Sequence, residues 1–159
     1  MKKVIAFTIS LLFIFTLTGC DNAKNNQLLV YSFSGENENF SIENGTIVLS
    51  DSENIFYGGN LKVVQSEYTK DIESYRAAFY TLTDGEQETI YVDEFYNNSP
   101  AELTAVDLGK MVSAGSDIRM QFENLSESQG KFYCQLNITD ADGNENSYTI
   151  ELTLTEITA

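Results

Sequence analysis

Alternation of apolar and polar residues is the feature that most constrains how this chain can fold. From Leu28 onward, Tyr, Phe, Ile, Val and Thr recur with a period of two, and Asn-Gly, Asp-Gly and Gly-Gly pairs interrupt the pattern. Successive side chains of a β-strand point to opposite faces of a sheet, so this period predicts strands with one buried face. We therefore expect an all-β chain of about eight to ten antiparallel strands.

The alternation is clearest in the last third of the chain, where three runs of alternating apolar residues all occupy even-numbered positions. They are Ile118, Met120, Phe122, Phe132, Cys134, Leu136, Ile138, Tyr148, Ile150, Leu152 and Leu154. Pairing even with even residues across a hairpin requires an odd number of loop residues. A three-residue loop, Asp142-Gly143-Asn144, is therefore predicted, with Leu136 opposite Ile150. Cys134 is expected to be a buried, unreactive core residue, because its neighbours on this face are apolar.

Two further hairpins are predicted from two-residue turns whose residues tolerate positive φ. Asn44-Gly45 is expected to join strands 39–43 and 46–50, with Phe40 opposite Leu49 and Ile42 opposite Ile47. Asp84-Gly85 is expected to join strands 75–83 and 86–95. That register places Ala78 opposite Tyr91, Phe79 opposite Ile90, and Arg76 opposite Asp93.

The segments between these hairpins carry weaker signals. Gly58-Gly59 predicts a bend or bulge between a strand from residue 55 and a second strand over 61–65. Ser99-Pro100-Ala101-Glu102 matches a capping box with proline at the first helical position, which favours a short helix near 100–108. A strand through 108–114 is the alternative for the end of this segment.

One domain, residues 28–159, accommodates all of these elements. Strands with a single apolar face bury that face by packing two sheets together, which predicts an antiparallel β-sandwich of immunoglobulin-like type. The Cys-Trp-Cys spacing of true immunoglobulin domains is absent, so the topology stays open, and a closed barrel is the alternative.

The beginning of the chain has the organisation of an export signal. Lys2 and Lys3 precede an apolar run from Val4 to Leu17, which is shorter than the roughly 20 residues of a membrane-spanning helix. The run ends in Leu17-Thr18-Gly19-Cys20, which resembles the lipobox of bacterial lipoproteins. That resemblance implies cleavage after Gly19, acylation of Cys20, and a location on the extracytoplasmic face of the cell membrane. Residues 1–19 are then the signal peptide and 20–27 a polar tether. Residues 31–61 also resemble small uncharacterised bacterial lipoproteins.

Charge and composition exclude several classes of function. Without residues 1–19 the chain holds 7 basic against 24 acidic residues, a formal balance of −17, so neither nucleic acid nor anionic lipid is an expected partner. The chain has no His, the usual general base and a frequent metal ligand. We expect a non-enzymatic binding or accessory module without a cofactor. The alternatives are a carbohydrate-binding or adhesin-like domain, and a secreted hydrolase or inhibitor.

The candidate sites are few. On the second hairpin, Tyr80, Tyr91, Arg76 and Asp93 are expected to share an outward face that could bind a glycan or peptide. An ordinary β-ribbon, or an inner face of the sandwich, explains the same residues. Residues 140–144 with Glu151 have the oxygen spacing of an EF-hand, but Gly143 and Glu145 fall at the wrong positions, so we expect a hairpin turn and no metal.

Overall fold

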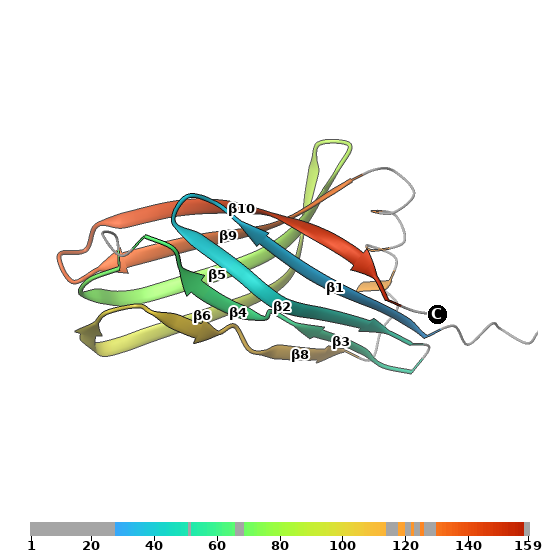
Figure 1. The fold of residues 1–159 in the computed structure, drawn as a ribbon, viewed down its shortest axis with the longest axis horizontal. Helices are drawn as coiled ribbons and strands as arrows, with labels where there is room; N and C mark the ends of the chain where they lie inside the picture. Colours follow the sequence, from blue (N-terminus) through green and yellow to red (C-terminus); the bar gives the residue numbers. More distant parts are fainter. Residues whose placement is uncertain are drawn as a thin grey trace, which may run out of the picture.

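A single antiparallel sheet contains every strand of the computed structural model, which describes residues 28–50, 52–65, 69–113, 118, 119, 122, 125 and 130–157. The strands of this described part are β1 (Leu29–Glu36), β2 (Phe40–Leu49), β3 (Asn54–Tyr57), β4 (Asn60–Val63), β5 (Ile72–Thr83), β6 (Glu86–Ala101), β7 (Ala105–Asp107), β8 (Lys110–Ser113), β9 (Lys131–Asp140) and β10 (Glu145–Glu156). Figure 1 shows them running roughly along the long axis of the molecule.

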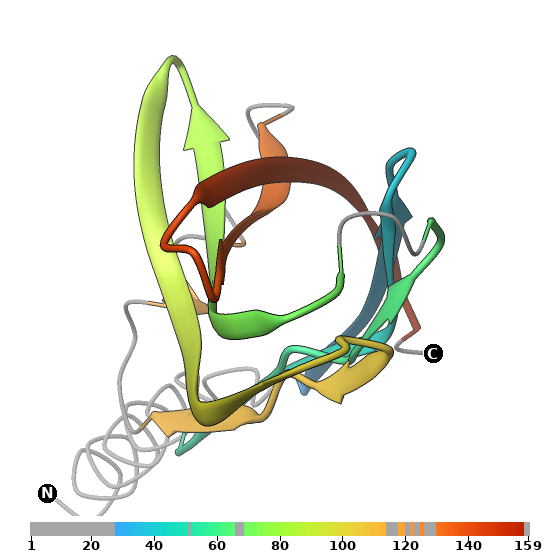
Figure 2. The same ribbon diagram turned by 90° about the vertical axis from the view of Figure 1, so that its left-hand side faces the viewer.

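The all-β antiparallel prediction is confirmed. The strand order is β6-β5-β9-β10-β1-β2-β3-β8, and β4 and β7 continue the ladder beside β2. Because strands twist, a sheet of this width curls, and it curves here into a near-barrel (Figure 2). Two halves of one sheet thus face each other across the core, as the layers of a sandwich do. The immunoglobulin-like topology stays a prediction.

The core lies where the alternation places it. Phe132, Cys134, Leu136 and Ile138 are all buried, and Ile150 and Leu152 lie beside them on β10. Phe33 belongs to an aromatic cluster, with its ring centroid 5.2 Å from that of Phe132, 5.5 Å from Phe56 and 5.8 Å from Phe79. Aromatic pairs at these separations each contribute about 0.5–1.5 kcal/mol beyond the area they bury.

The prediction of a hairpin at Asn44-Gly45 is wrong, because β2 runs straight through this pair. Asn44 has a φ of 59°, and two residues of β2, Glu43 and Asn44, face the single residue Ser34 of β1 here, so the chain forms a β-bulge. The partner of β2 also bends at this level: β4 pairs with β2 on one side of the bulge, and β3 pairs with β2 on the other. The predicted bend at Gly58-Gly59 is therefore confirmed. The expected pairing of Phe40 with Leu49 does not form, although both are buried.

The bulge in β2, the bend between β3 and β4 and the break between β7 and β8 lie side by side in the sheet. β7 and β8 are separated at Leu108-Gly109, and the amide of Gly58 donates to the carbonyl of Gly109 at 3.0 Å. A Cβ on Gly59, whose φ is 82°, would collide with the backbone of Glu43 and Gly45. The glycines thus allow backbones to approach closely where the sheet turns its corner.

The β5–β6 hairpin keeps the predicted register only near its turn. Tyr80 pairs with Thr89 as expected, but a bulge at Ile90 shifts every later pair by one residue. Phe79 therefore faces Tyr91, not Ile90, and Arg76 faces Glu94, not Asp93. The bulge lets both Ile90 and Tyr91 pack against the core, which an uninterrupted alternation would not allow.

The β9–β10 connection has the predicted three loop residues, shifted by one position. Asp140 donates its amide to the carbonyl of Asn144, so the loop is Ala141-Asp142-Gly143. Gly143 has a φ of 80°, the left-handed conformation that such a loop requires at its third position. Leu136 is consequently opposite Tyr148, and the predicted pairing with Ile150 is wrong.

Two more predictions fail around residues 100–125. The expected helix near 100–108 is wrong, because β6 continues to Ala101 and β7 occupies 105–107. The expected strand at Ile118 and Phe122 is also wrong, because their backbone is helical, as is that of Leu125. The buried residues Ile118, Phe122 and Leu125 are spaced four and three apart, so they also satisfy a helical period.

The predicted signal peptide, the lipidated Cys20 and the tether 20–27 lie outside the described residues. Within the described ranges, no helix is long and apolar enough to cross a membrane.

Candidate functional site

The structure separates the four residues predicted to share a binding face. Tyr80 lies on the outer face of the sheet, where its ring stacks on that of Tyr133 at 5.4 Å. Arg76 is on the same face and forms an ion pair with Glu94 at 2.8 Å. Tyr91 instead packs against Phe56 with 5.3 Å between centroids, on the inner side of β6. The register shift at Ile90 is the cause, because it moves Tyr91 and Asp93 to the opposite face.

Tyr91 and Asp93 lie along the seam, which we define as the line where the edge of β6 faces β7 and β8. β6 and β7 share no ladder, yet their side chains meet. A Cβ placed on Gly109 would lie 2.8 Å from the hydroxyl oxygen of Tyr91 and 3.5 Å from Oδ1 of Asp93. Figure 2 shows β6 approaching β7 and β8 at this side of the near-barrel. Between the described strands β6, β7 and β8, side chains thus close the seam in place of a backbone ladder.

Phenol groups surround two carboxylates at the seam. The hydroxyl of Tyr75 donates to Oδ2 of Asp93 at 2.9 Å, and the amide of Gly109 donates to Oδ1 of Asp107 at 2.9 Å. Burial, followed by the charge and hydrogen bonding of Asp93, raises the pKa of Tyr75. Burial, then Asp93 and Asp107, raises the pKa of Tyr91 as well. Both phenols therefore stay protonated at neutral pH, and Tyr75 acts as a hydrogen-bond donor to Asp93.

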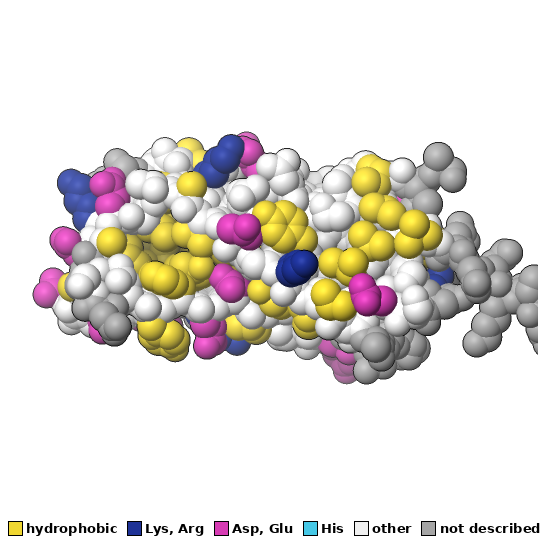
Figure 3. All heavy atoms as spheres, turned by 90° about the horizontal axis from the view of Figure 1, so that it is seen from below, with side chains coloured by type: hydrophobic (Ala, Val, Ile, Leu, Met, Phe, Trp, Pro, Cys, Tyr) yellow, Lys and Arg dark blue, Asp and Glu magenta, His cyan; other side chains and the backbone are white. Residues whose placement is uncertain are grey.

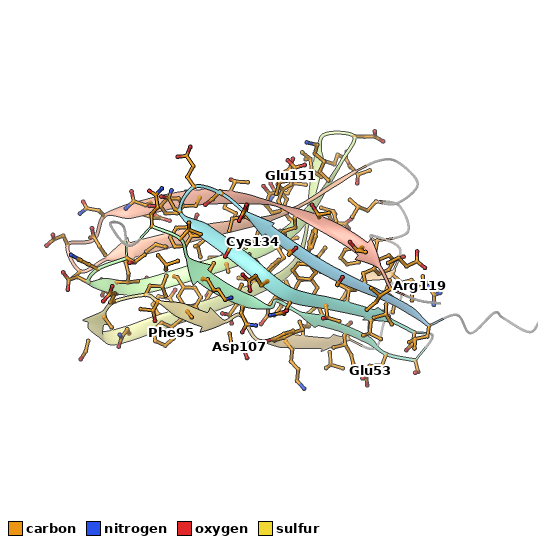
Figure 4. The ribbon with its side chains drawn as sticks, viewed as in Figure 1. Glu53, Phe95, Asp107, Arg119, Cys134 and Glu151 are labelled. Carbon is orange, nitrogen blue, oxygen red and sulfur yellow. The ribbon has the colours of Figure 1, made fainter. Side chains whose placement is uncertain are left out.

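An apolar groove opens at one end of the seam and has a volume of about 220 Å³. It is lined by Ile72, Tyr75, Phe95, Asn97, Ala101, Glu102, Leu103, Thr104, Ala105 and Val106. The rings of Tyr75 and Phe95 stack at 5.7 Å with an interplanar angle of 20° and form one wall. Figure 3 shows an apolar hollow toward one end of this side of the molecule, with acidic side chains around it. Phe95 and Asp107 lie on the same side (Figure 4).

Local irregularity in β6 creates this groove. Between the pairs Ser74–Tyr96 and Ile72–Ala101, the single residue Glu73 of β5 faces residues 97–100 of β6. Asn97 stabilises this stretch of unpaired residues, because its Oδ1 accepts a hydrogen bond from the amide of Ser99 at 3.1 Å. The chain then returns across the seam, where the amide of Leu103 donates to the carbonyl of Thr69 at 2.9 Å. Asn97 and Ala101, at the two ends of this stretch, line the groove beside Ile72 and Tyr75.

The wall of the groove contains an exposed aromatic side chain. Phe95 keeps 48% of its surface exposed although it belongs to the wall, and its neighbour Tyr96, on the opposite face of β6, keeps 74%. Exposed large aromatic side chains are enriched at recognition surfaces, because they offer apolar contact area at a low cost in conformational entropy. The arrangement therefore suits binding of an apolar group, with hydrogen-bonding groups at its border.

A second hollow of about 390 Å³ lies near Tyr31, Phe132 and Leu154. Its border contains Lys131 and Glu151, which form an ion pair at 3.2 Å. Glu151 raises the pKa of Lys131, first through its hydrogen bond and then through its charge. Because these two charged groups neutralise each other, the hollow is a weaker candidate for ligand binding than the groove is.

The residues considered for metal binding and thiol chemistry are engaged structurally. Asp140 Oδ1 accepts hydrogen bonds from the amides of Asp142 and Asn144, at 3.0 and 2.9 Å, and these contacts hold the loop. The side chain and backbone of Asn144 lower the pKa of Asp140. Over the described ranges, no three His, Cys, Asp or Glu residues form a group that could hold a metal ion. Cys134 is buried, as predicted, and burial raises its pKa.

Sequence reasoning missed the groove because the strongest local signal pointed elsewhere. Ser99-Pro100-Ala101-Glu102 satisfied a helix-capping pattern, and that interpretation ended the strand too early. The alternation of Tyr91, Asp93, Phe95 and Asn97 continued past the predicted strand end and was the signal that could have placed them on one side.

The fold therefore defines the chain as an all-β protein with one curled antiparallel sheet and an apolar groove beside its seam. No family model matches the chain, and neither a curated protein nor a solved structure matches it significantly.

Proposed function

We propose that this protein is a lipid-anchored envelope protein on the extracytoplasmic face of the cell membrane, and that its β-domain is a non-enzymatic binding module. The lipobox-like Leu17-Thr18-Gly19-Cys20 supports the anchoring. The single observation that supports binding is the apolar groove with its half-exposed Phe95 stacked on Tyr75. The surplus of acidic residues argues against attachment through anionic lipid head groups, so the acyl chains on Cys20 provide the attachment.

Mass spectrometry of the membrane fraction tests the anchor. We expect an acylated Cys20 at the mature N-terminus of the parent protein, and unprocessed, unacylated protein for Cys20→Ser. A parent protein whose mature N-terminus lies elsewhere contradicts the anchoring.

Ligand-observed NMR with benzyl alcohol, a small neutral aromatic probe, tests the groove. We expect saturation transfer to the ring of the probe, lost in Phe95→Ala because that change removes one wall. Tyr96→Ala is the matched control, since it removes a more exposed aromatic ring from the opposite face of the same strand. Equal signals from the parent and Phe95→Ala would contradict binding at the groove.

A carbohydrate-binding role is the second candidate, supported by the outer face of β5, β9 and β10. Next to the stacked Tyr80 and Tyr133, the hydroxyl of Ser147 donates to Oδ1 of Asn137 at 2.9 Å, and Gln135 contacts Ser147 at 3.1 Å. Aromatic rings beside a row of amide and hydroxyl groups suit a sugar. A glycan array probed with the parent and with Tyr133→Ser tests this role, and a parent that retains no glycan would exclude it.

A further inference from the structure

The size of the groove limits what it accepts. Pockets that enclose a whole small molecule measure about 300–1,000 Å³. The groove, at about 220 Å³, is smaller, and its walls are open at the edge of β6. A single ring or branched side chain therefore fits, while the remainder of the ligand lies outside along the strand.

The charges around the groove are mainly acidic, and Lys62, which pairs with the lining residue Ala105 in the β4–β7 ladder, is neutralised by Glu43. Glu102 lies in the wall, and Asp93 and Asp107 lie further along the seam, whereas none of the lining residues is Lys or Arg. Arg76, on the outer face of β5, is neutralised by Glu94. Lys70 precedes the groove residue Ile72 in sequence, but Asp71 and Glu73 accompany it, so this segment is also net negative.

The spacing of Phe95 and Asp93 along β6 matches the spacing of alternate residues in an extended peptide. Phe95 and Asp93 are alternate residues on the seam side of β6, so their Cα atoms lie about 6.7 Å apart at about 3.3–3.4 Å per residue. An extended peptide has the same repeat. An apolar side chain placed against Phe95 thus carries the side chain two residues away to the level of Asp93.

We propose that the groove binds an extended peptide segment in which an apolar residue and a Lys or Arg are two positions apart. This inference rests on the proposed binding function and names its ligand. The apolar side chain fills the groove against Phe95 and Tyr75, and the basic side chain pairs with Asp93, with Glu102 and Asp107 adding to the negative potential. Asp93 keeps acceptor capacity for this contact, because a carboxylate has about four lone-pair sites and Tyr75 occupies one.

Three capped tripeptides of equal length test the proposal: acetyl-Phe-Ser-Lys-amide, its Gln analogue and its Glu analogue. Binding to the protein, purified as the cell processes it, is measured by ligand-observed NMR at low salt. We expect affinity to fall from the Lys to the Gln to the Glu peptide, by about fivefold at each step, for one exposed charge pair near 4 Å. The difference should shrink toward unity near 1 M salt, where the Debye length is about 3 Å.

Two acidic variants identify the charges. Glu102→Gln and Asp93→Asn should weaken binding of the Lys peptide by a larger factor than binding of the Gln peptide. Glu86→Gln, which removes the same charge from the exposed start of β6, is the matched control and should change neither. Because Asp93 accepts the bond from Tyr75, Glu102→Gln keeps the test valid if Asp93→Asn fails to fold.

The possible results distinguish failure of the peptide proposal from failure of the groove as a binding site. If the three peptides bind equally, the groove binds apolar groups and the basic specificity is overturned. If neither the peptides nor benzyl alcohol bind, the proposed binding function fails as well. If the Lys peptide responds to Glu86→Gln as strongly as to Glu102→Gln, the attraction is a general property of the acidic surface, and the proposal is overturned.

Discussion

Gly45 and Phe33 provide a sharp test of how the sheet is built. The two residues face each other in the β1–β2 ladder, and a Cβ on Gly45 would fall well inside 3.0 Å of three atoms of the Phe33 ring. Phe33 is only 2% exposed and its ring touches three other aromatic rings, so it has no room to move away. Gly45→Ala should therefore cost about 1–3 kcal/mol, the usual effect of overpacking.

A double-mutant cycle isolates this contact. Phe33→Ala should cost about 3–5 kcal/mol, as for other buried phenylalanines. With the ring removed, the extra methyl group at position 45 has space, so the double variant should cost little more than Phe33→Ala alone. The coupling free energy is then about 1–3 kcal/mol, measurable by urea unfolding.

The control is Gly85→Ala in the β5–β6 turn. Gly85 has a φ of 86° and nothing within 4 Å of an added Cβ, so its substitution strains the backbone without a collision. Its cost should not depend on Phe33. If Asn44-Gly45 were instead a hairpin turn, Gly45→Ala would act through the backbone in the same way. Equal costs of Gly45→Ala with and without Phe33 would refute the bulge and the close packing of the ring.

Three further predictions concern the core and the β9–β10 loop. Leu136→Ala should lower the free energy of unfolding by about 2–5 kcal/mol, because it leaves a cavity in the core. Gln135→Ala, on the outer face, should change it by no more than about 0.5 kcal/mol. Equal losses for the two variants in urea titrations would show that the alternation does not mark a buried face. Cys134 has a pKa raised above its ordinary value of 9.0, so the unfolded thiol ionises first and stability falls as pH rises. Cys134→Ala should remove about 1 kcal/mol of that fall between pH 9 and pH 10, and parallel curves for parent and variant would contradict the burial. Asp140 has a pKa lowered by Asn144, so its contribution is present above the ordinary value of 3.8 and is lost as pH falls through its folded value. Asp140→Ala should therefore lower the thermal midpoint at pH 7, and the difference from the parent should vanish in acid; a constant difference would exclude the carboxylate as its source.

The identity of the buried faces followed from sequence alone. A strand alternates faces at every residue, so the even-numbered series from Phe132 to Ile138 had to lie on one side of the sheet, and it does. The Asp84-Gly85 hairpin was also predictable, because positive φ at Gly is a local constraint. The odd number of residues in the β9–β10 loop was predictable as well, because the apolar residues of both strands have even numbers.

The tertiary structure decided which of several locally equivalent signals takes effect. Asn44-Gly45 has the chemistry of a turn, but the chain continues, because the bulge lets Phe33 pack over Gly45 while β3 and β4 pair on either side. Residues that lie far apart in the sequence supply these contacts, so no local window contains them.

The candidate site depended on the same kind of information. One extra residue at Ile90 moved Tyr91 and Asp93 from the outer face to the seam, and residues 97–100 opened the groove. A bulge changes the parity of everything beyond it, yet it leaves little trace in composition or period. The sequence alone therefore determined that this protein is a sheet with one apolar face. Packing between distant strands decided where that sheet leaves an apolar surface open to a ligand.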